Sequence, residues 1–181
     1  VCSSDLYSVR FGLILPILFF KNIFGFYYGY IIYVNIIYVT TGISLYLLFR
    51  KYINIYSGVI AVIIITTSPV FALAVLWTHP DAVIVPYLII AICILLLNLE
   101  NKSLLPILFS GILFGMSANS NIFATSLIFV ITIGYIYVAR NLALLKIIFR
   151  LLIIGIGFIS VYIFGFFYYK YCCNNGNFLE P

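Results

Sequence analysis

Residues 26–49 read FYYGYIIYVNIIYVTTGISLYLLF, a run without Asp, Glu, Lys, Arg or Pro. Its length slightly exceeds the ~20 residues that an α-helix needs to cross the hydrocarbon core of a bilayer. The polar groups inside it are small ones such as Asn35, which can hydrogen-bond to neighbouring helices. Arg50 and Lys51 follow directly and end the run. We therefore expect a membrane-spanning helix here.

The composition of the whole chain extends this expectation. Of its 181 residues, 66% are hydrophobic and 7% are charged, whereas a soluble domain carries about 25% charged residues. A lipid-exposed backbone must satisfy its hydrogen bonds internally, as a helix or a closed barrel. Barrel strands alternate apolar and polar residues, but these runs are continuously apolar. The sequence thus predicts an all-α, polytopic transmembrane helical bundle.

Further apolar runs follow the first. We predict six spans, at residues 26–49, 57–77, 82–98, 104–118, 121–138 and 151–169. A shorter run at residues 9–24, bracketed by Arg10 and Lys21, predicts one short interfacial helix along the membrane surface. Gly111 and Gly115 are four residues apart, a spacing that lets helix backbones approach closely.

The basic residues predict the orientation. Grouping alternate loops puts six of the nine on one side: Arg50, Lys51, Lys102, Arg140, Lys146 and Arg150. The other three, Arg10, Lys21 and Lys170, fall on the opposite side. Cytosolic loops carry the excess of Lys and Arg, so we expect the His79–Asp81 loop to face outward from a cell or inner membrane. This also accounts for the net charge of +5 without a nucleic-acid partner.

The N-terminal residues suggest an incomplete chain. Residues 1–6 (VCSSDL) match the translation of a common short-read sequencing adaptor, and we interpret them as an assembly scar. The rest, residues 7–181, is then expected to be a partial, single transmembrane domain whose native sequence continues upstream of Tyr7.

Asp81 is the main candidate for chemistry, because it alone among the four acids lies at the mouth of two predicted spans. A carboxylate at a membrane boundary is costly without a role or partner. It could bind a divalent cation, contact a hydroxyl or act as a general base. Alternatively, it is an N-cap for a helix that starts at Ala82, where an acid also suits the helix dipole.

Three other polar residues are open to two interpretations each. His79, the only histidine, could bind phosphate or shuttle a proton, or it is an interfacial polar residue. Arg10 could pair with a lipid phosphate, or it is a snorkelling anchor. Asn121 could reach a sugar, or it forms a turn. The sequence shows no Gly-rich phosphate loop and no His/Cys metal cluster.

The order of these features resembles the polytopic GT-C glycosyltransferases, which include protein mannosyltransferases and bacterial lipid-A or lipopolysaccharide sugar transferases. The resemblance covers residues 9–138 or so. Its motifs, in chain order, are Arg10-Phe11-Gly12 with Pro16 and Phe24-Gly25, the basic turn Arg50-Lys51, Ser68-Pro69, His79-Pro80-Asp81, and the Gly111-xxx-Gly115 helix in a hairpin.

The resemblance implies transfer of a sugar from a polyprenyl-phosphate donor to a glycan, lipid or protein acceptor at the outer face of the membrane. It implies that Asp81 matches an auxiliary acid, which assists the site or its metal, and that Arg10 matches a basic residue of the first outward loop. The family's principal catalytic acid has no counterpart after Tyr7, so we expect it upstream and expect this fragment to be inactive. Many relatives carry Lys where this chain has Asn121, which puts charge-based donor binding there in question.

Two other classes remain open at this stage. A transporter or lipid-linked oligosaccharide flippase would carry internal repeats and ionisable residues deep in its spans, and the sequence shows no repeat. A non-enzymatic membrane scaffold would tolerate the loss of every outward polar residue.

Overall fold

The computed structural model describes residues 11–69, 81–100 and 103–172. Within these ranges every regular element is helical, which confirms the all-α prediction. The elements are α2 (Phe11–Phe24), α3 (Phe26–Tyr52), α4 (Ile55–Thr66), α6 (Asp81–Leu97), α7 (Leu105–Ser120), α8 (Ile122–Val138), the short 3-10 helix η1 (Ala139–Asn141) and α9 (Leu144–Cys172).

Among the described residues, three helices are long and apolar enough to cross a membrane: Tyr27–Tyr52, Phe123–Asn141 and Leu144–Phe167. Three shorter apolar helices, α4, α6 and α7, accompany them. Helix α6 has 17 residues, at the lower limit of about 17 for a spanning helix. The predicted span at residues 57–77 is only partly described. Helix α4 ends at Thr66, before Ser68-Pro69, and residues 70–77 lie outside the described ranges.

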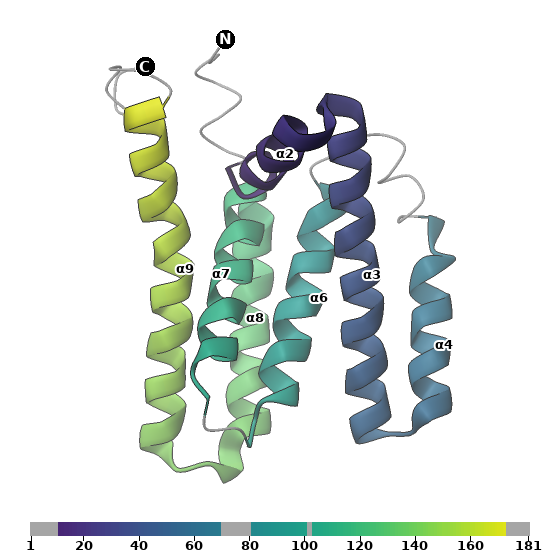
Figure 1. Cartoon of the computed structure of the whole chain (residues 1–181). Helices are drawn as coiled ribbons and strands as arrows, with labels where there is room; N and C mark the ends of the chain where they lie inside the picture. The colour runs from purple at the N-terminus through teal and green to yellow at the C-terminus, as the bar shows by residue number, and fades with distance from the viewer. Residues whose placement is uncertain (1–10, 70–80, 101–102, 173–181) are drawn as a thin grey trace.

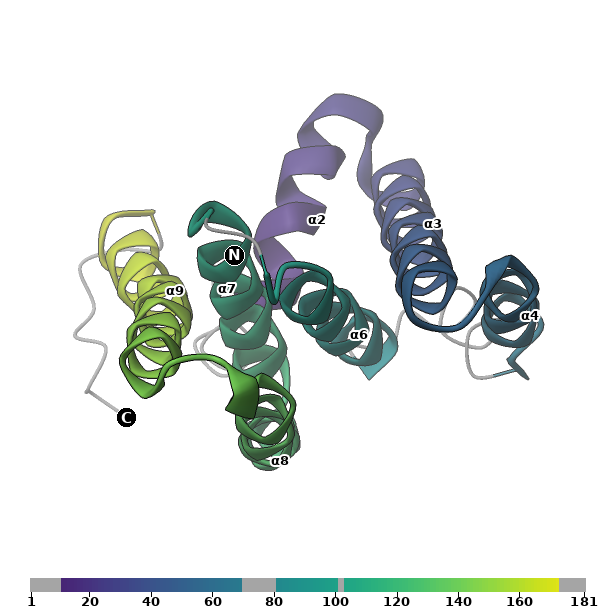
Figure 2. The same ribbon diagram turned by 90° about the horizontal axis from the view of Figure 1, so that it is seen from below.

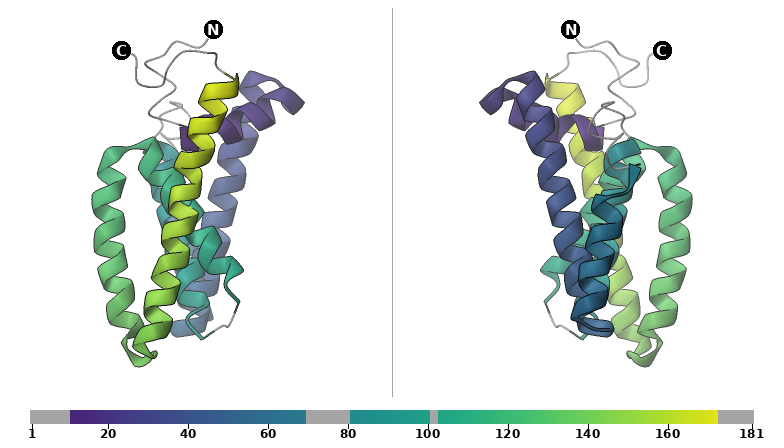
Figure 3. Two further views of the ribbon diagram at one scale, coloured as in Figure 1. Left: turned by 90° about the vertical axis from the view of Figure 1, so that its left-hand side faces the viewer. Right: turned by 90° about the vertical axis from the view of Figure 1, so that its right-hand side faces the viewer.

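The long helices run side by side, and α2 lies across one end of them (Figure 1). Seen along the bundle, α9, α7, α6, α3 and α4 follow one another, with α8 on one side of this row and α2 on the other (Figure 2). Figure 3 shows the same separation of α8 from α2 in side view. The crosswise course of α2 agrees with the short surface helix predicted at residues 9–24.

Two glycines make the sharp corner between α2 and α3. Gly25 has φ 78°, a backbone conformation that residues with a Cβ seldom adopt. Gly29 lies against the backbone of α2, where an added Cβ would come within 2.7 Å of the Lys21 nitrogen. The corner therefore depends on glycine at both positions.

Helix α7 packs against α6 through two buried serines. Ser110 Oγ donates a hydrogen bond to the Ala91 carbonyl at 3.2 Å, and Ser117 Oγ donates to the Ile84 carbonyl at 3.4 Å. Both the donors and the acceptors are seven residues apart, about two helical turns. The serines thus fix the register of α7 on α6, as small polar residues do between membrane helices.

The glycines of α7 face α9 instead. A Cβ on Gly115 would come within 2.7 Å of the Phe158 carbonyl oxygen. Gly111 and, from the α9 side, Gly157 are at least as tightly enclosed by the opposite backbone. This confirms that the Gly111-xxx-Gly115 pair marks a close helix contact, and we call the contact the glycine seam.

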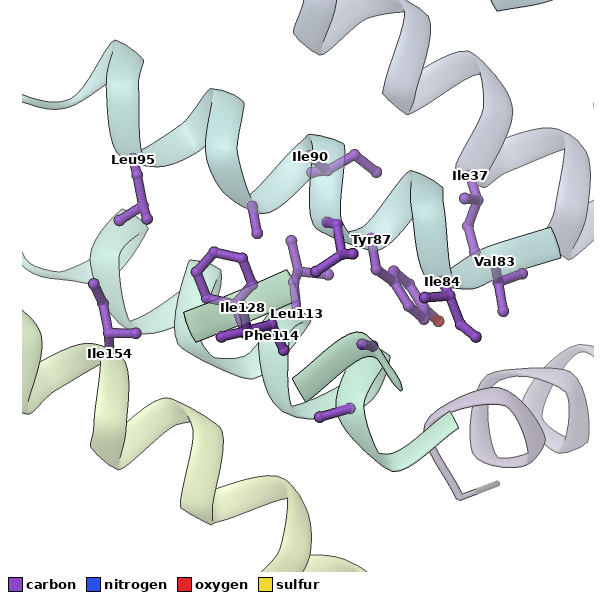
Figure 4. Close-up of a cluster of buried hydrophobic side chains, with 14 of the residues drawn as sticks. Ile37, Val83, Ile84, Tyr87, Ile90, Leu95, Leu113, Phe114, Ile128 and Ile154 are labelled. Atoms are coloured by element: carbon purple, nitrogen blue, oxygen red, sulfur yellow. The ribbon is translucent and has the colours of Figure 1, made fainter. Parts of the chain in front are cut away.

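A cluster of buried apolar side chains fills the space around α6 and α7 (Figure 4). Val83 and Ala91 of α6 are fully buried, and Phe114 of α7 is 1% exposed. The outer helices differ, because large apolar side chains such as Ile64 of α4 and Phe129 of α8 remain exposed. Apolar side chains on the outside of an apolar bundle are the surface that faces lipid.

The predicted start of the last span is wrong, as the position of Arg150 shows. The last span was predicted at residues 151–169 with Arg150 in the preceding loop, but α9 begins at Leu144 and contains Arg150. The side chain is 1% exposed, and its Nη1 donates to the Tyr135 hydroxyl of α8 at 3.2 Å. A buried cation needs such hydrogen bonds. The Tyr135 hydroxyl supplies one, so Arg150 can be buried within α9. No sequence pattern reveals this partner.

The bundle has two different ends. We call the end crossed by α2 the α2 end; α6 begins there, α7 meets α8 there and α9 ends there (Figure 1). The opposite end holds the α3–α4 and α8–α9 connections, and we call it the basic end. Four basic residues lie at or near it: Arg50, Lys51, Arg140 and Lys146.

Candidate functional site

The candidate site is the α2 end, where the first turn of α6 meets the turn between α7 and α8. Asp81 is the first residue of α6. The hydrogen bond from Ser117 to the Ile84 carbonyl joins α6 and α7 one turn further into the bundle. The structure thus brings Asp81 and Asn121 to neighbouring helix termini at the same end.

Asn121 ends α7 and caps α8. Its Oδ1 accepts a hydrogen bond from the backbone N–H of Phe123 at 3.0 Å, and its backbone is extended. This is the geometry of an N-cap residue, which confirms the interpretation of Asn121 as a turn residue. Contact with a sugar stays a prediction for this side chain.

Arg10 and His79, the other two predicted site residues, lie outside the described residues. Their proposed roles therefore rest on the sequence alone. Helix α2, which follows Arg10 directly, contacts both α3 and α7, so the chain after Arg10 crosses the same end of the bundle as the start of α6.

A buried tyrosine pair lies below this end. Tyr33 of α3 and Tyr87 of α6 share a hydrogen bond between their hydroxyls, and each residue is 4% exposed. The Tyr33 ring also contacts the Phe20 ring of α2, with a centroid distance of 6.0 Å. These contacts link α2, α3 and α6.

Sequence reasoning missed this pair for a physical reason. The tyrosines are 54 residues apart in the chain, and tyrosine is also enriched at membrane interfaces. An interfacial location fits Tyr28 and Tyr56, which are 66% and 77% exposed at the starts of α3 and α4, near opposite ends of the bundle. Spacing within one helix could not separate the two kinds of tyrosine.

The described residues do not form a metal site by themselves. Within the described ranges, no three His, Cys, Asp or Glu side chains come together. A divalent cation at Asp81 stays a prediction.

The helices, their apolar outer surface and the surface helix define a polytopic integral membrane protein. The sequence model of the dolichyl-phosphate-mannose-protein mannosyltransferase family matches residues 15–165, so the chain belongs to this family of membrane glycosyltransferases. This confirms the resemblance to the GT-C glycosyltransferases. No curated protein and no solved structure gives a significant match.

Proposed function

We propose that this protein transfers a sugar from a polyprenyl-phosphate donor to a glycan, lipid or protein acceptor at the outer face of the membrane. The family match over residues 15–165 carries the proposal. The location of Asp81 supports it, because α6 starts with this acid at the end of the bundle opposite the basic end. Since basic residues favour the cytosolic side, this arrangement supports an outward position for the start of α6.

In the proposed reaction, the acceptor hydroxyl attacks the anomeric carbon of the donor sugar. The bond between that carbon and the phosphate oxygen breaks, and polyprenyl phosphate leaves with the electron pair. The transition state has oxocarbenium character, as in other glycosyl transfer. The acceptor's proton must go to a base, and the negative charge of the leaving phosphate must be stabilised.

We assign Asp81 an auxiliary role in this chemistry, as a hydrogen-bond acceptor that orients or helps to deprotonate the acceptor hydroxyl. Arg10 and His79 are proposed contacts of the donor phosphate, and Asn121 a proposed sugar contact through atoms other than its capping Oδ1. A transporter or flippase remains the alternative class, but family membership favours sugar transfer.

The test compares two acids at opposite ends of the bundle. Asp81→Asn and Glu100→Gln make the same chemical change, and Glu100 is exposed at the basic end, next to the end of α6. The complete gene product would be assayed in native membranes with radiolabelled polyprenyl-phosphate sugars, mannose first, by incorporation into endogenous acceptors.

We expect Asp81→Asn to lower transfer by about 100-fold, the lower range for a group that assists proton transfer, and Glu100→Gln to leave it unchanged. Unchanged transfer by Asp81→Asn would remove Asp81 from the site. Failure of the wild-type protein to transfer any donor sugar would contradict the proposed function itself.

A further inference from the structure

We propose that Tyr33 and Tyr87 are positioning residues for sugar transfer, because their hydrogen bond holds the surface helix α2 in a fixed relation to the first turn of α6. The inference rests on the proposed function, which makes that turn part of the site. It assigns the pair no contact with the substrate.

The Tyr33–Tyr87 hydrogen bond joins α3 to α6. The two phenol hydroxyls meet between α3 and α6, and both side chains are almost completely buried. A buried hydroxyl that loses its partner costs about 1–3 kcal/mol. The pair is thus a directional link between α3 and α6 inside the buried cluster that also holds Val34 and Ile37 of α3 and Val83 of α6. Further hydrogen bonds between these two helices lie at the opposite end of the bundle.

Two contacts connect α3 to α2. The Phe20 ring packs on the Tyr33 ring, and Gly29 of α3 leaves no room between itself and the α2 backbone at Phe20 and Lys21. Helix α2 is therefore held against α3 at two points, one backbone contact and one ring contact. A change in the position of Tyr33 would therefore shift α2.

Tyr87 lies close to the start of α6 along the helix. Tyr87 is six residues after Asp81, a rise of about 9 Å along the helix. Between them, the Ile84 carbonyl accepts the hydrogen bond of Ser117 from α7. Hydrogen bonds from α7 and α3 thus hold the first two turns of α6 from two neighbouring helices.

Accurate placement at this end matters for rate more than for stability. Reacting groups must lie about 3–3.5 Å apart in an aligned geometry, and a misplacement of about 1 Å can cost about 100-fold in rate. Replacing both tyrosines by phenylalanine removes the hydrogen bond together with both of its hydroxyls. Neither hydroxyl of the pair is then left buried without the other. Such a paired replacement is close to neutral for folding, so the double variant separates positioning from stability.

The experiment uses Tyr33→Phe/Tyr87→Phe in the complete protein, with Tyr46→Phe as the matched control. Tyr46 lies on the same helix but packs its ring on Gly58 of α4. Two readouts apply: kcat and KM for the polyprenyl-phosphate sugar that the wild-type protein uses, and the distance distribution between spin labels at Phe19 of α2 and Val85 of α6. Both labelled positions are exposed, and the four native cysteines are replaced in the labelled protein.

For the double variant we expect a kcat about tenfold lower, a KM within about twofold of wild type and a broader label distance distribution. Tyr46→Phe should change none of these. A wild-type kcat or an unchanged distance distribution would overturn the inference. If the double variant fails to fold, Phe20→Leu, which removes the ring contact between α2 and Tyr33, takes its place under the same criteria.

The two proposals fail in different ways. If Asp81→Asn keeps full transfer, the assignment of Asp81 is wrong whatever the tyrosines do. If Asp81→Asn loses transfer while the double variant keeps a wild-type kcat and label distances, only the positioning role is wrong. The label distances are independent of any substrate, so they test the link between α2 and α6 directly.

Discussion

The two ends of this helical bundle differ in how they use their polar groups. At the basic end, side chains satisfy helix ends. Lys51 Nζ donates to the Leu97 carbonyl at 3.0 Å, and the Tyr52 hydroxyl donates to the Leu96 carbonyl at 2.7 Å. At the α2 end, a helix crosses the bundle and α6 begins with a carboxylate.

This difference indicates a division of roles. Cations near a helix C-terminus interact favourably with its dipole, and the guanidinium of Arg140 lies 4.7 Å from the centre of the Tyr137 ring. These are anchoring contacts, typical of a membrane interface. The α2 end instead brings together the termini of several helices, among them the start of α6, whose first residue is Asp81. We therefore assign anchoring to the basic end and propose the α2 end as the place of the chemistry.

The largest expected effect comes from the glycine seam, on which both ends depend. In Gly157→Ala, the added Cβ would lie 2.9 Å from the Ile112 nitrogen and would meet the α7 backbone. We expect the variant to lose about 3 kcal/mol of stability, measured by thermal unfolding in detergent. Gly155→Ala is the control, because nothing lies within 4 Å of its added Cβ. Equal stability of the two variants would contradict the seam.

Gly29→Ala should disturb the α2 end alone. The new Cβ would force α2 away from α3, at a cost of about 2 kcal/mol. We expect sugar transfer to fall more than this loss of stability explains, since α2 would no longer cross the site in its native position. Gly134→Ala on α8, whose Cβ would meet nothing within 4 Å, should leave both stability and transfer unchanged. Normal transfer by Gly29→Ala would exclude a role for α2.

Tyr135→Phe should lower the stability of the bundle without affecting the α2 end. It removes the hydroxyl that accepts from buried Arg150, and we expect a loss of about 1.5 kcal/mol in thermal unfolding. The turnover rate per folded molecule should be unchanged. Tyr137→Phe, two residues away and 65% exposed, should match wild type. A fall in turnover rate with Tyr135→Phe would contradict the assignment of chemistry to the α2 end alone.

The smallest effect is expected at the end of α6. Lys51→Met loses the hydrogen bond to the Leu97 carbonyl and the favourable interaction with the helix dipole, about 0.5 kcal/mol. Arg50→Met, one residue earlier and also exposed, should cost less in the same unfolding measurement. A larger loss for Arg50→Met would contradict the capping role of Lys51.

The sequence could predict what depends on local pattern. The apolar runs predict the helix class and most spans, and the four-residue spacing predicts the close contact at Gly111 and Gly115. Gly25 and Gly29 have the same spacing, but there Gly29 lies in a tight contact while Gly25 has a positive φ and open space around it. The spacing alone does not distinguish this corner from the contact at Gly111 and Gly115. The spans can be recognised from local sequence because a helix surrounded by lipid needs a continuous apolar run.

What could not be predicted depends on partners distant in the chain. Arg150 was predicted to precede the last span, because the Tyr135 hydroxyl that accepts its hydrogen bond belongs to another helix. Tyr33 and Tyr87 look like other tyrosines until α3 and α6 are packed together. The roles of Arg10 and His79, which lie outside the described residues, and of the Asp81 side chain stay predictions.

The most direct test of the account is the orientation of the two ends. Asn22 of α2 and Asn141 of η1 are both exposed and lie at opposite ends. Each would be changed to Cys in the complete protein with its native cysteines replaced, and intact cells would be treated with a membrane-impermeant maleimide. The account predicts labelling of Asn22→Cys in intact cells and of Asn141→Cys only after permeabilisation. The reverse pattern would place the α2 end in the cytosol and contradict sugar transfer at the outer face.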